Sequence, residues 1–211
     1  MDNSHVLYNI YMTPRIIYED DNVIVLDKPS GMLSMRKHPE KSADEPSVED
    51  YGILVHRLDR ATSGIIIVAK NEEVRANLAR QFQNRTVKKT YYALVSPPPK
   101  LPHAIIDVPL TRDLKRHTAF RPDPAGRSAQ TEYWVESTKG NVALVKLQPK
   151  TGRTHQLRVH LAHLGSPILG DTVYHGADAP RLMLHATELE LTLPGGERKT
   201  FTSPLPPEFS L

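Results

Sequence analysis

The stretch that decides the fold covers residues 56–68 and reads HRLDRATSGIIIV. A polar turn leads directly into the β-branched segment Ile65–Val68, and this composition predicts a buried strand. Asp59 lies in the turn between Arg57 and Arg60, whose positive charges favour the ionised carboxylate. A carboxylate at a strand end can act as a nucleophile or a base. An aspartate that only caps a turn is more common, so this stretch alone leaves both roles open.

The chain before this stretch is predicted to be rich in short strands and turns. Tetrapeptide 28–31, KPSG, contains the proline and glycine of a turn, and we interpret it as support for the site. The remaining expected elements are a flexible tail (1–14), a hairpin (strands 15–18 and 23–27), a loop (35–50) and a short apolar segment (53–55).

The chain after this stretch contains one clear helix, over residues 72–83. Asn71 is a suitable N-cap, and Val74, Leu78 and Phe82 recur with helical spacing. The other expected elements are a strand (88–95), a surface excursion (100–128), a hairpin (131–137 and 142–147), a helix (154–164) and a hairpin (182–193 and 198–202). Hairpins dominate, which predicts an α+β fold with a mainly antiparallel mixed sheet and flanking helices, in one domain over 15–211.

The bulk composition excludes several classes of protein. The 211 residues include no cysteine, which excludes disulfides and thiolate metal sites. No phosphate-binding loop of the GxxxxGK[ST] or GxGxxG type occurs, the N-terminus shows no secretory signal, and no apolar run approaches a membrane span. We therefore expect a cytoplasmic protein.

The distribution of charge says more than the net charge of +3. Residues 74–90 carry five bases and no acid, and residues 146–160 carry four bases and no acid. Segments of this kind can present a positive face to phosphates. Solvated helix faces explain them equally well, so the charge alone does not decide for a nucleic acid.

Two further segments carry candidate chemistry. Residues 151–160, TGRTHQLRVH, lead from a turn into a helix, where Arg158 lies beside the apolar stripe and can bind a carboxylate such as Asp59 through two hydrogen bonds. The histidines there lack the His-Glu-x-x-His spacing, so we expect no metal. In residues 88–93, KKTYYA, Tyr91 and Tyr92 alternate along a strand, so one of them can stack on a base; ordinary strand tyrosines are the simpler alternative.

These motifs together resemble the RluA-type pseudouridine synthases. The resemblance begins at His56-Arg57-Leu58-Asp59 with Thr62-Ser63-Gly64, and it extends in family order over residues 15–203. The four other motifs that carry it are residues 27–31 (DKPSG), 88–91 (KKTY), 152–160 (GRTHQLRVH) and 181–186 (RLMLHA). The short N-terminal part resembles the single-domain members, which act on large-subunit ribosomal RNA and on tRNA.

The resemblance implies a role for each matching residue. Asp59 corresponds to the catalytic aspartate, Tyr91 to the tyrosine that packs on the target uracil, and Arg158 to the arginine paired with the aspartate. Arg57 corresponds to a residue that enters the RNA stack when the uridine is flipped out, and Leu184 to a wall of the base pocket. The further residues expected to contact RNA are Arg60, Arg80, Lys88, Lys89, Arg153, His155 and Gln156, together with the loops 36–52 and 100–128.

The expected reaction is the isomerisation of uridine to pseudouridine, which needs no cofactor. Its expected partner is RNA, with no membrane and no metal, and the protein is expected to act as a monomer. Two alternatives remain at this point. A glycosidase or N-glycosylase usually uses two paired carboxylates, and Asp59 has no comparable partner motif. An RNA-binding module or chaperone would explain the basic segments but not the combination of Asp59 and Arg158.

Overall fold

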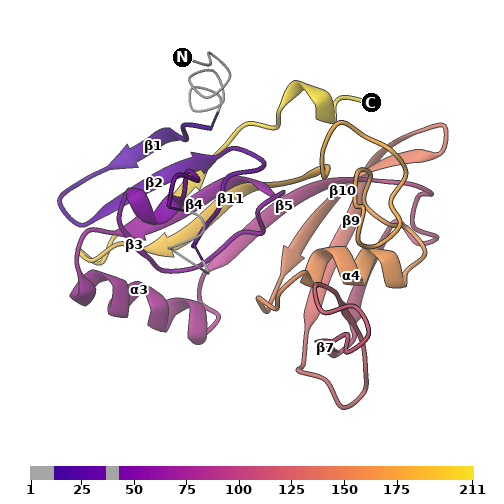
Figure 1. The fold of residues 1–211 in the computed structure, drawn as a ribbon, viewed down its shortest axis with the longest axis horizontal. Coiled ribbons are helices and arrows are strands. Elements are labelled where there is room, and N and C mark those ends of the chain that lie inside the picture. Colours follow the sequence, from indigo (N-terminus) through magenta and orange to yellow (C-terminus); the bar gives the residue numbers. More distant parts are fainter. Residues whose placement is uncertain (1–11, 37–42) are drawn as a thin grey trace. The chain divides into compact units, whose positions relative to one another are not determined.

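The structure is a computed structural model that describes residues 12–36 and 43–211. The chain forms two compact units. Unit 1 comprises Met1–Lys88 and Ala186–Ser203, and unit 2 comprises Lys89–His185 and Pro204–Leu211. In Figure 1, helix α3 (Glu72–Gln83) lies beside the strands of unit 1, and helix α4 (Gln156–His163) lies within unit 2.

Unit 1 is built on a sheet whose strands follow the order β1, β2, β4, β11. β1 pairs with β2, and β2 with β4, in antiparallel register. Two further strands complete it, β3 against β4 and β12 against β11, both antiparallel. The bounds are Arg15–Glu19 (β1), Val23–Lys28 (β2), Ile53–Leu54 (β3), Ser63–Ala69 (β4), Leu184–Thr192 (β11) and Arg198–Thr202 (β12), with a 3-10 helix at Val48–Asp50 (η1).

The core of unit 1 forms where α3 covers the sheet. Val74 and Leu78 of α3 are buried against apolar side chains from β2, β4, β11 and β12. All seven residues of β4 are buried, as expected for a strand rich in isoleucine and valine. The Asn71 side chain accepts a hydrogen bond from the Val74 amide and caps the helix, as predicted.

Unit 2 contains four antiparallel strands in the order β5, β10, β9, β6. A separate two-stranded hairpin, β7 with β8, projects from the same unit. The bounds are Lys88–Val95 (β5), His103–Asp107 (β6), Leu110–Arg112 (β7), Phe120–Pro122 (β8), Gln130–Lys139 (β9) and Val142–Pro149 (β10), with a 3-10 helix at Pro207–Phe209 (η2). Val159 of α4 packs with Leu110, Ala119, Ala129 and Tyr174, which holds the hairpin segment against the helix.

The structure confirms the α+β class, the predicted hairpins and the helix over residues 72–83. Two expectations are wrong in part. The excursion 100–128 contains β6, β7 and β8, whose short lengths gave no visible periodicity. The second helix begins at Gln156 rather than Thr154, because His155 has a left-handed φ of 56° that a helix cannot continue through. Residues 1–11 of the expected tail lie outside the described residues, while Met12 is only 8% exposed and so is packed.

Candidate active site

The loop that carries Asp59 joins β3 to β4, directly before the fully buried strand β4. The Asp59 carbonyl accepts a hydrogen bond from the Thr62 amide at 3.0 Å, which closes a tight turn. Leu58 is only 5% exposed and anchors the loop in the core, whereas Asp59 is half-buried. The carboxylate is therefore presented on a backbone that is fixed on both sides.

Lys28, the last residue of β2, is completely buried. Its ammonium donates hydrogen bonds to the carbonyl oxygens of Pro29 at 3.0 Å, Met32 at 3.0 Å and Arg60 at 3.1 Å. A lysine ammonium has three N–H groups and no acceptor, so three carbonyls match its donors one for one. Because Arg60 directly follows Asp59, Lys28 ties the loop of Asp59 to the turn after β2.

Two serines of the same turn add further bonds to this loop. The Ser30 hydroxyl donates to the Ala61 carbonyl at 2.7 Å. The Ser34 hydroxyl donates to the Leu58 carbonyl at 2.7 Å and accepts from the Leu58 amide at 3.1 Å. Segment 28–34 thus holds the backbone on both sides of Asp59.

Arg60 is bound at both its backbone and its side chain. Its carbonyl accepts from the Gly31 amide at 2.8 Å, and its Nε donates to the Gly31 carbonyl at 2.9 Å. The guanidinium also forms an ion pair of 2.8 Å with Glu45. Half of the side chain, 51%, remains exposed, so Arg60 is both a structural link and a surface cation.

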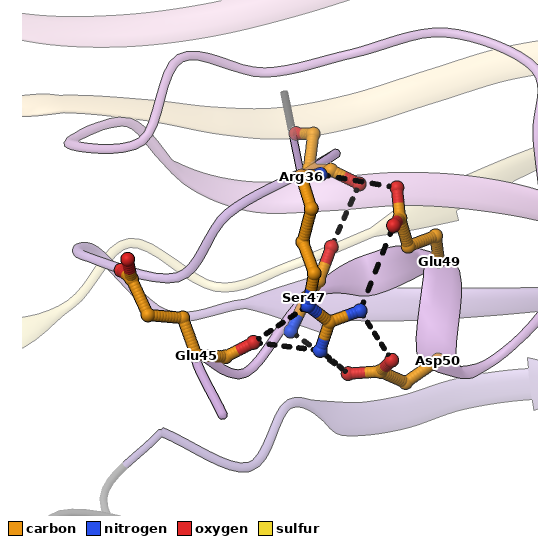
Figure 2. A network of polar contacts seen from close by, with 6 residues as sticks. Arg36, Glu45, Ser47, Glu49 and Asp50 are labelled. Carbon is orange, nitrogen blue, oxygen red and sulfur yellow. Dashed lines mark hydrogen bonds and ion pairs between the residues drawn. The ribbon is translucent and has the colours of Figure 1, made fainter. Parts of the chain in front are cut away.

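Figure 2 shows a polar network around Arg36 that fixes the backbone next to Glu45. The Arg36 guanidinium donates to both carboxylate oxygens of Asp50, at 2.6 and 2.7 Å, and to the Glu45 carbonyl. These hydrogen bonds with Asp50 raise the pKa of Arg36, and the same bonds lower the pKa of Asp50. The Asp50 carboxylate also accepts from the Ser47 amide, so it caps η1 at the same time. Because Glu45 bonds Arg36 through its carbonyl and Arg60 through its carboxylate, the network extends to the Asp59 loop.

His56 and Arg57 face different surroundings at the start of the loop. The Nε2 atom of His56 accepts a hydrogen bond from the Ile67 amide at 3.2 Å, and its ring stacks on Phe82 with centroids 4.6 Å apart. Arg57 is exposed. His56 therefore anchors the loop inside unit 1, and the next side chain is accessible to a ligand.

In unit 2, Tyr91 and Lys89 lie two residues apart on β5, so their side chains share one face. Tyr91 is paired with Leu147 of β10, which is paired with Tyr133 of β9. Lys89 bonds the Thr151 carbonyl at 3.3 Å, and its burial lowers its pKa to about 8. Tyr91 and Tyr92 are both half-buried.

The turn before α4 is organised by Gln156, which is 4% exposed. Its side-chain oxygen accepts from the Thr151 hydroxyl at 2.7 Å and from the Arg153 amide at 3.0 Å. Its side-chain nitrogen donates to the Gln130 carbonyl at 2.9 Å and the Thr131 hydroxyl at 3.0 Å. The side-chain amide has two donors and an oxygen with two lone pairs, and all of them have protein partners. The structure therefore gives Gln156 an internal role and does not support the RNA contact that we predicted for it.

Arg158, on α4, is 7% exposed and binds Asp171, which is 1% exposed. Its Nε donates to one carboxylate oxygen and its Nη2 to the other, both at 2.8 Å. Asp171 was not among the residues predicted from the sequence. In the sequence Asp171 is an aspartate of a polar loop, with Gly170 before it and Gly176 after it, and many turns share this pattern.

The comparisons with known proteins decide the family. Residues 22–163, more than half of the chain, match the model of a family described as RNA pseudouridylate synthase. The chain belongs to the RNA pseudouridine synthase family. The chain is 43% identical to the dual-specificity RNA pseudouridine synthase RluA of Escherichia coli K12, over 90% of this chain and 92% of that protein. It is 38% identical to the ribosomal large subunit pseudouridine synthase D of Borreliella burgdorferi, over 92% and 66%.

A solved structure agrees with this assignment. Human RNA pseudouridylate synthase domain containing 1 is similar with a TM-score of 0.79 and 25% identity, over 95% of this chain and 87% of that one. The protein is therefore an RNA uridine isomerase, and RNA is its substrate.

The remaining residues with a predicted RNA contact occupy different surroundings in this pseudouridine synthase. Arg80 is exposed on α3. The Lys88 side chain is 74% exposed and lies 3.3 Å from the Glu190 carboxylate. Arg153 donates through Nε to the Ser128 carbonyl, and His155 is half-buried. Leu184 is 3% exposed, which fits a residue in the wall of a base pocket better than a residue that contacts RNA on the surface.

Within residues 12–36 and 43–211, no group of three or more histidine and acidic side chains is placed to hold a metal ion. Among the same residues, no helix has the length and apolar character to cross a membrane.

Proposed function

We propose that Asp59 is the reacting carboxylate of this pseudouridine synthase, and that Tyr91 and Arg158 act with it on one flipped uridine, with residues 15–211 as one catalytic domain. The observation that carries the proposal is the support of the Asp59 loop by segment 28–34, including the three-carbonyl contact of Lys28. A reaction without a cofactor depends on the position of its reacting groups, and such a loop supplies that position.

Each residue has a distinct task in the proposed reaction. The C1′–N1 bond of uridine breaks, the uracil turns, C5 bonds to C1′ and releases its proton, and N1 takes up a proton. Asp59 either attacks the nucleoside or removes a sugar proton, while the guanidinium of Arg158 orients the carboxylate. Tyr91 packs on the uracil, and Leu184 helps to keep water from the detached base. Arg57 fills the space that the uridine leaves in the RNA, which its exposure permits.

We propose that the substrates are tRNA and large-subunit ribosomal RNA. The support comes from the Escherichia coli relative, which is named a dual-specificity enzyme and is matched over 92% of its length. The relative from Borreliella burgdorferi is named for the ribosomal large subunit. The exposed cations Arg57, Arg60, Arg80 and Lys88, with Lys89, Arg153 and His155, are proposed to hold the RNA backbone, so affinity will fall as salt rises. The enzyme is proposed to act as a monomer in the cytoplasm.

The test is tritium release from RNA labelled at uracil C5, with wild type and Asp59→Asn. Total tRNA and large-subunit ribosomal RNA are assayed separately, and free uracil is measured in parallel. The proposal expects tritium release by the wild type from both RNA classes, no release by Asp59→Asn, and no free uracil. Release by Asp59→Asn at the wild-type rate would contradict the role of Asp59. Release from one RNA class alone would contradict dual specificity but leave the catalytic proposal intact.

A further inference from the structure

The Arg158–Asp171 pair has a geometry that fixes the arginine from one edge. Nε and Nη2 bind the two oxygens of the same carboxylate at 2.8 Å each, so the plane of the guanidinium follows the plane of Asp171. Nη1 is not part of that contact. The other edge of the guanidinium, formed by Nη1 and Nη2, can donate hydrogen bonds to a second carboxylate or to a substrate. Asp171 therefore determines the direction in which this edge points.

The Asp171 carboxylate is itself held by the backbone of its own turn. Besides Nη2 of Arg158, its Oδ1 accepts from the amides of Val173 at 3.0 Å and Tyr174 at 3.1 Å. Two glycines make this turn possible. A Cβ on Gly170 would collide with the Arg181 carbonyl, and a Cβ on Gly176 would collide with the Ile168 carbonyl. The turn is thus closely packed, and the carboxylate has little freedom to move.

The same turn is fixed to β5, the strand of Tyr91. The Leu169 amide donates to the Leu94 carbonyl at 2.9 Å, and the Ser96 amide donates to the Pro167 carbonyl at 3.2 Å. These bonds flank the bridge between Val95 and Ile168. These main-chain bonds hold the turn of Asp171 against β5. Because Asp171 orients Arg158, they also fix the direction of the Arg158 side chain relative to β5.

The ring of Tyr174 packs against the face of the Arg158 guanidinium. The ring centroid lies 5.1 Å from Cζ of Arg158, a cation–π contact between two buried side chains. The Tyr174 hydroxyl accepts from the Phe120 amide at 2.9 Å and lies 2.8 Å from Nδ1 of His155, to which its own proton can be donated. The ring is therefore fixed by its hydroxyl to the β7–β8 hairpin segment and to the start of α4.

We infer that Asp171 is a positioning residue for Arg158 in pseudouridine formation, and that Tyr174 assists it by holding the face of the guanidinium. The inference rests on the proposed catalytic role of Arg158. Asp171 and Tyr174 themselves contact neither the uridine nor the RNA. They act by keeping the guanidinium in one orientation, so that its outer edge needs no rearrangement when the uridine is bound.

The test is a set of single-turnover rates with enzyme in excess over C5-labelled RNA. The single variants are Asp171→Asn, Asp171→Glu, Tyr174→Phe and Arg158→Lys, and two double variants combine Arg158→Lys with Asp171→Asn or with Tyr174→Phe. Asp178→Asn is the matched control, because Asp178 is an exposed aspartate of the same unit. Circular dichroism and thermal unfolding establish that each variant is folded.

Asp171→Asn is expected to lower the single-turnover rate about 10- to 100-fold, with a change in RNA affinity of less than about 2-fold. Tyr174→Phe is expected to lower the rate about 3- to 10-fold, since the ring stays and only its hydroxyl bonds are lost. In the Arg158→Lys background both effects should shrink to less than about 2-fold, because the arginine that they position is absent. The conservative Asp171→Glu keeps a carboxylate and should recover part of the rate.

The results distinguish an error in the proposed role of Arg158 from an error in the inference about Asp171. If Arg158→Lys has the wild-type rate, the proposed role of Arg158 is wrong, and the inference about Asp171 falls with it. If Arg158→Lys is slow but folded Asp171→Asn has the wild-type rate, only the inference is wrong. Equal losses in both backgrounds would show a general structural role and also overturn it. If Asp171→Asn does not fold, Tyr174→Phe decides, and an unchanged rate for it overturns the inference.

Discussion

Lys28→Met is the most direct test of how the Asp59 loop is held. The variant keeps the length and the apolar stem of the side chain but removes the ammonium, which bonds three carbonyls in a completely buried position. The Arg60 carbonyl keeps the Gly31 amide as a donor, so the loss falls mainly on the carbonyls of Pro29 and Met32. Hydrogen bonds to a charged group contribute about 1.5–3 kcal/mol each, which gives roughly 3–6 kcal/mol for two.

Part of that loss is offset, because the variant no longer buries a charge. We therefore expect the free energy of unfolding to fall by about 3 kcal/mol, and the melting temperature by roughly 6–12 °C. The loosened loop should also lower the rate of pseudouridine formation at saturating RNA about 10-fold. Urea unfolding, thermal unfolding and tritium release measure the three effects.

Lys70→Met is the matched control for this experiment. Lys70 also lies in unit 1 and forms an ion pair of 2.7 Å with Glu19, but its side chain is 33% exposed. Exposed ion pairs contribute about 0–1 kcal/mol, so this variant should remain close to wild type in stability and rate. A Lys28→Met enzyme that also stays within about 1 kcal/mol of wild type would refute the reasoning, because the three carbonyls would then not depend on the ammonium.

Three further predictions concern the backbone and two buried bases. Gly64 has a φ of 109°, and a Cβ there would collide with the Ala186 carbonyl. Gly64→Ala should therefore unfold at a temperature at least 10 °C lower, which corresponds to roughly 4 kcal/mol or more. The control is Gly195→Ala, which has nothing within 4 Å of the added Cβ and should not change thermal unfolding. Burial lowers the pKa of Lys89 to about 8 from 10.5, so between these two values the unfolded state binds more protons than the folded state. The stability of wild type relative to Lys89→Met should therefore rise between about pH 8 and 10.5. A difference in the free energy of urea unfolding that does not change with pH would contradict this. Burial also lowers the pKa of His160 below 6.5, so stability present above pH 6.5 should be lost as the pH falls below it, and His160→Gln should remove most of this slope in the same assay.

Those parts of the fold that depend on local patterns were predictable. The helix over residues 72–83 has a side-chain cap and three apolar residues at helical spacing, and both signals come from within the segment itself. The strand after Asp59 is a run of β-branched residues that is buried throughout. In contrast, the strands at 103–107, 110–112 and 120–122 are short and partly exposed, so their pairing partners, rather than their own sequence, decide their structure.

The candidate site was predictable in its residue types but not in its supporting contacts. Asp59 and Arg158 were identified from motifs, whereas the burial of Lys28 runs against the usual preference of lysine for the surface. Nothing in the sequence shows that three carbonyls converge on its ammonium, because the carbonyls of Pro29 and Met32 depend on how the turn folds and that of Arg60 comes from 32 residues along the chain. Asp171 was missed for the same reason, since its partner Arg158 is 13 residues away.

Each unit, taken by itself, uses a buried charge to position a loop or a side chain. In unit 1 the ammonium of Lys28 holds the backbone beside Asp59, and in unit 2 the carboxylate of Asp171 holds the guanidinium of Arg158. A buried charge is costly unless it is fully bonded, so it is a poor choice where only stability is needed. It does, however, impose directions that apolar packing does not, because each hydrogen bond fixes an angle as well as a distance. The proposed reaction moves a detached base between two bonds without a cofactor, and in that proposal the groups held in these directions are the Asp59 loop and the Arg158 guanidinium.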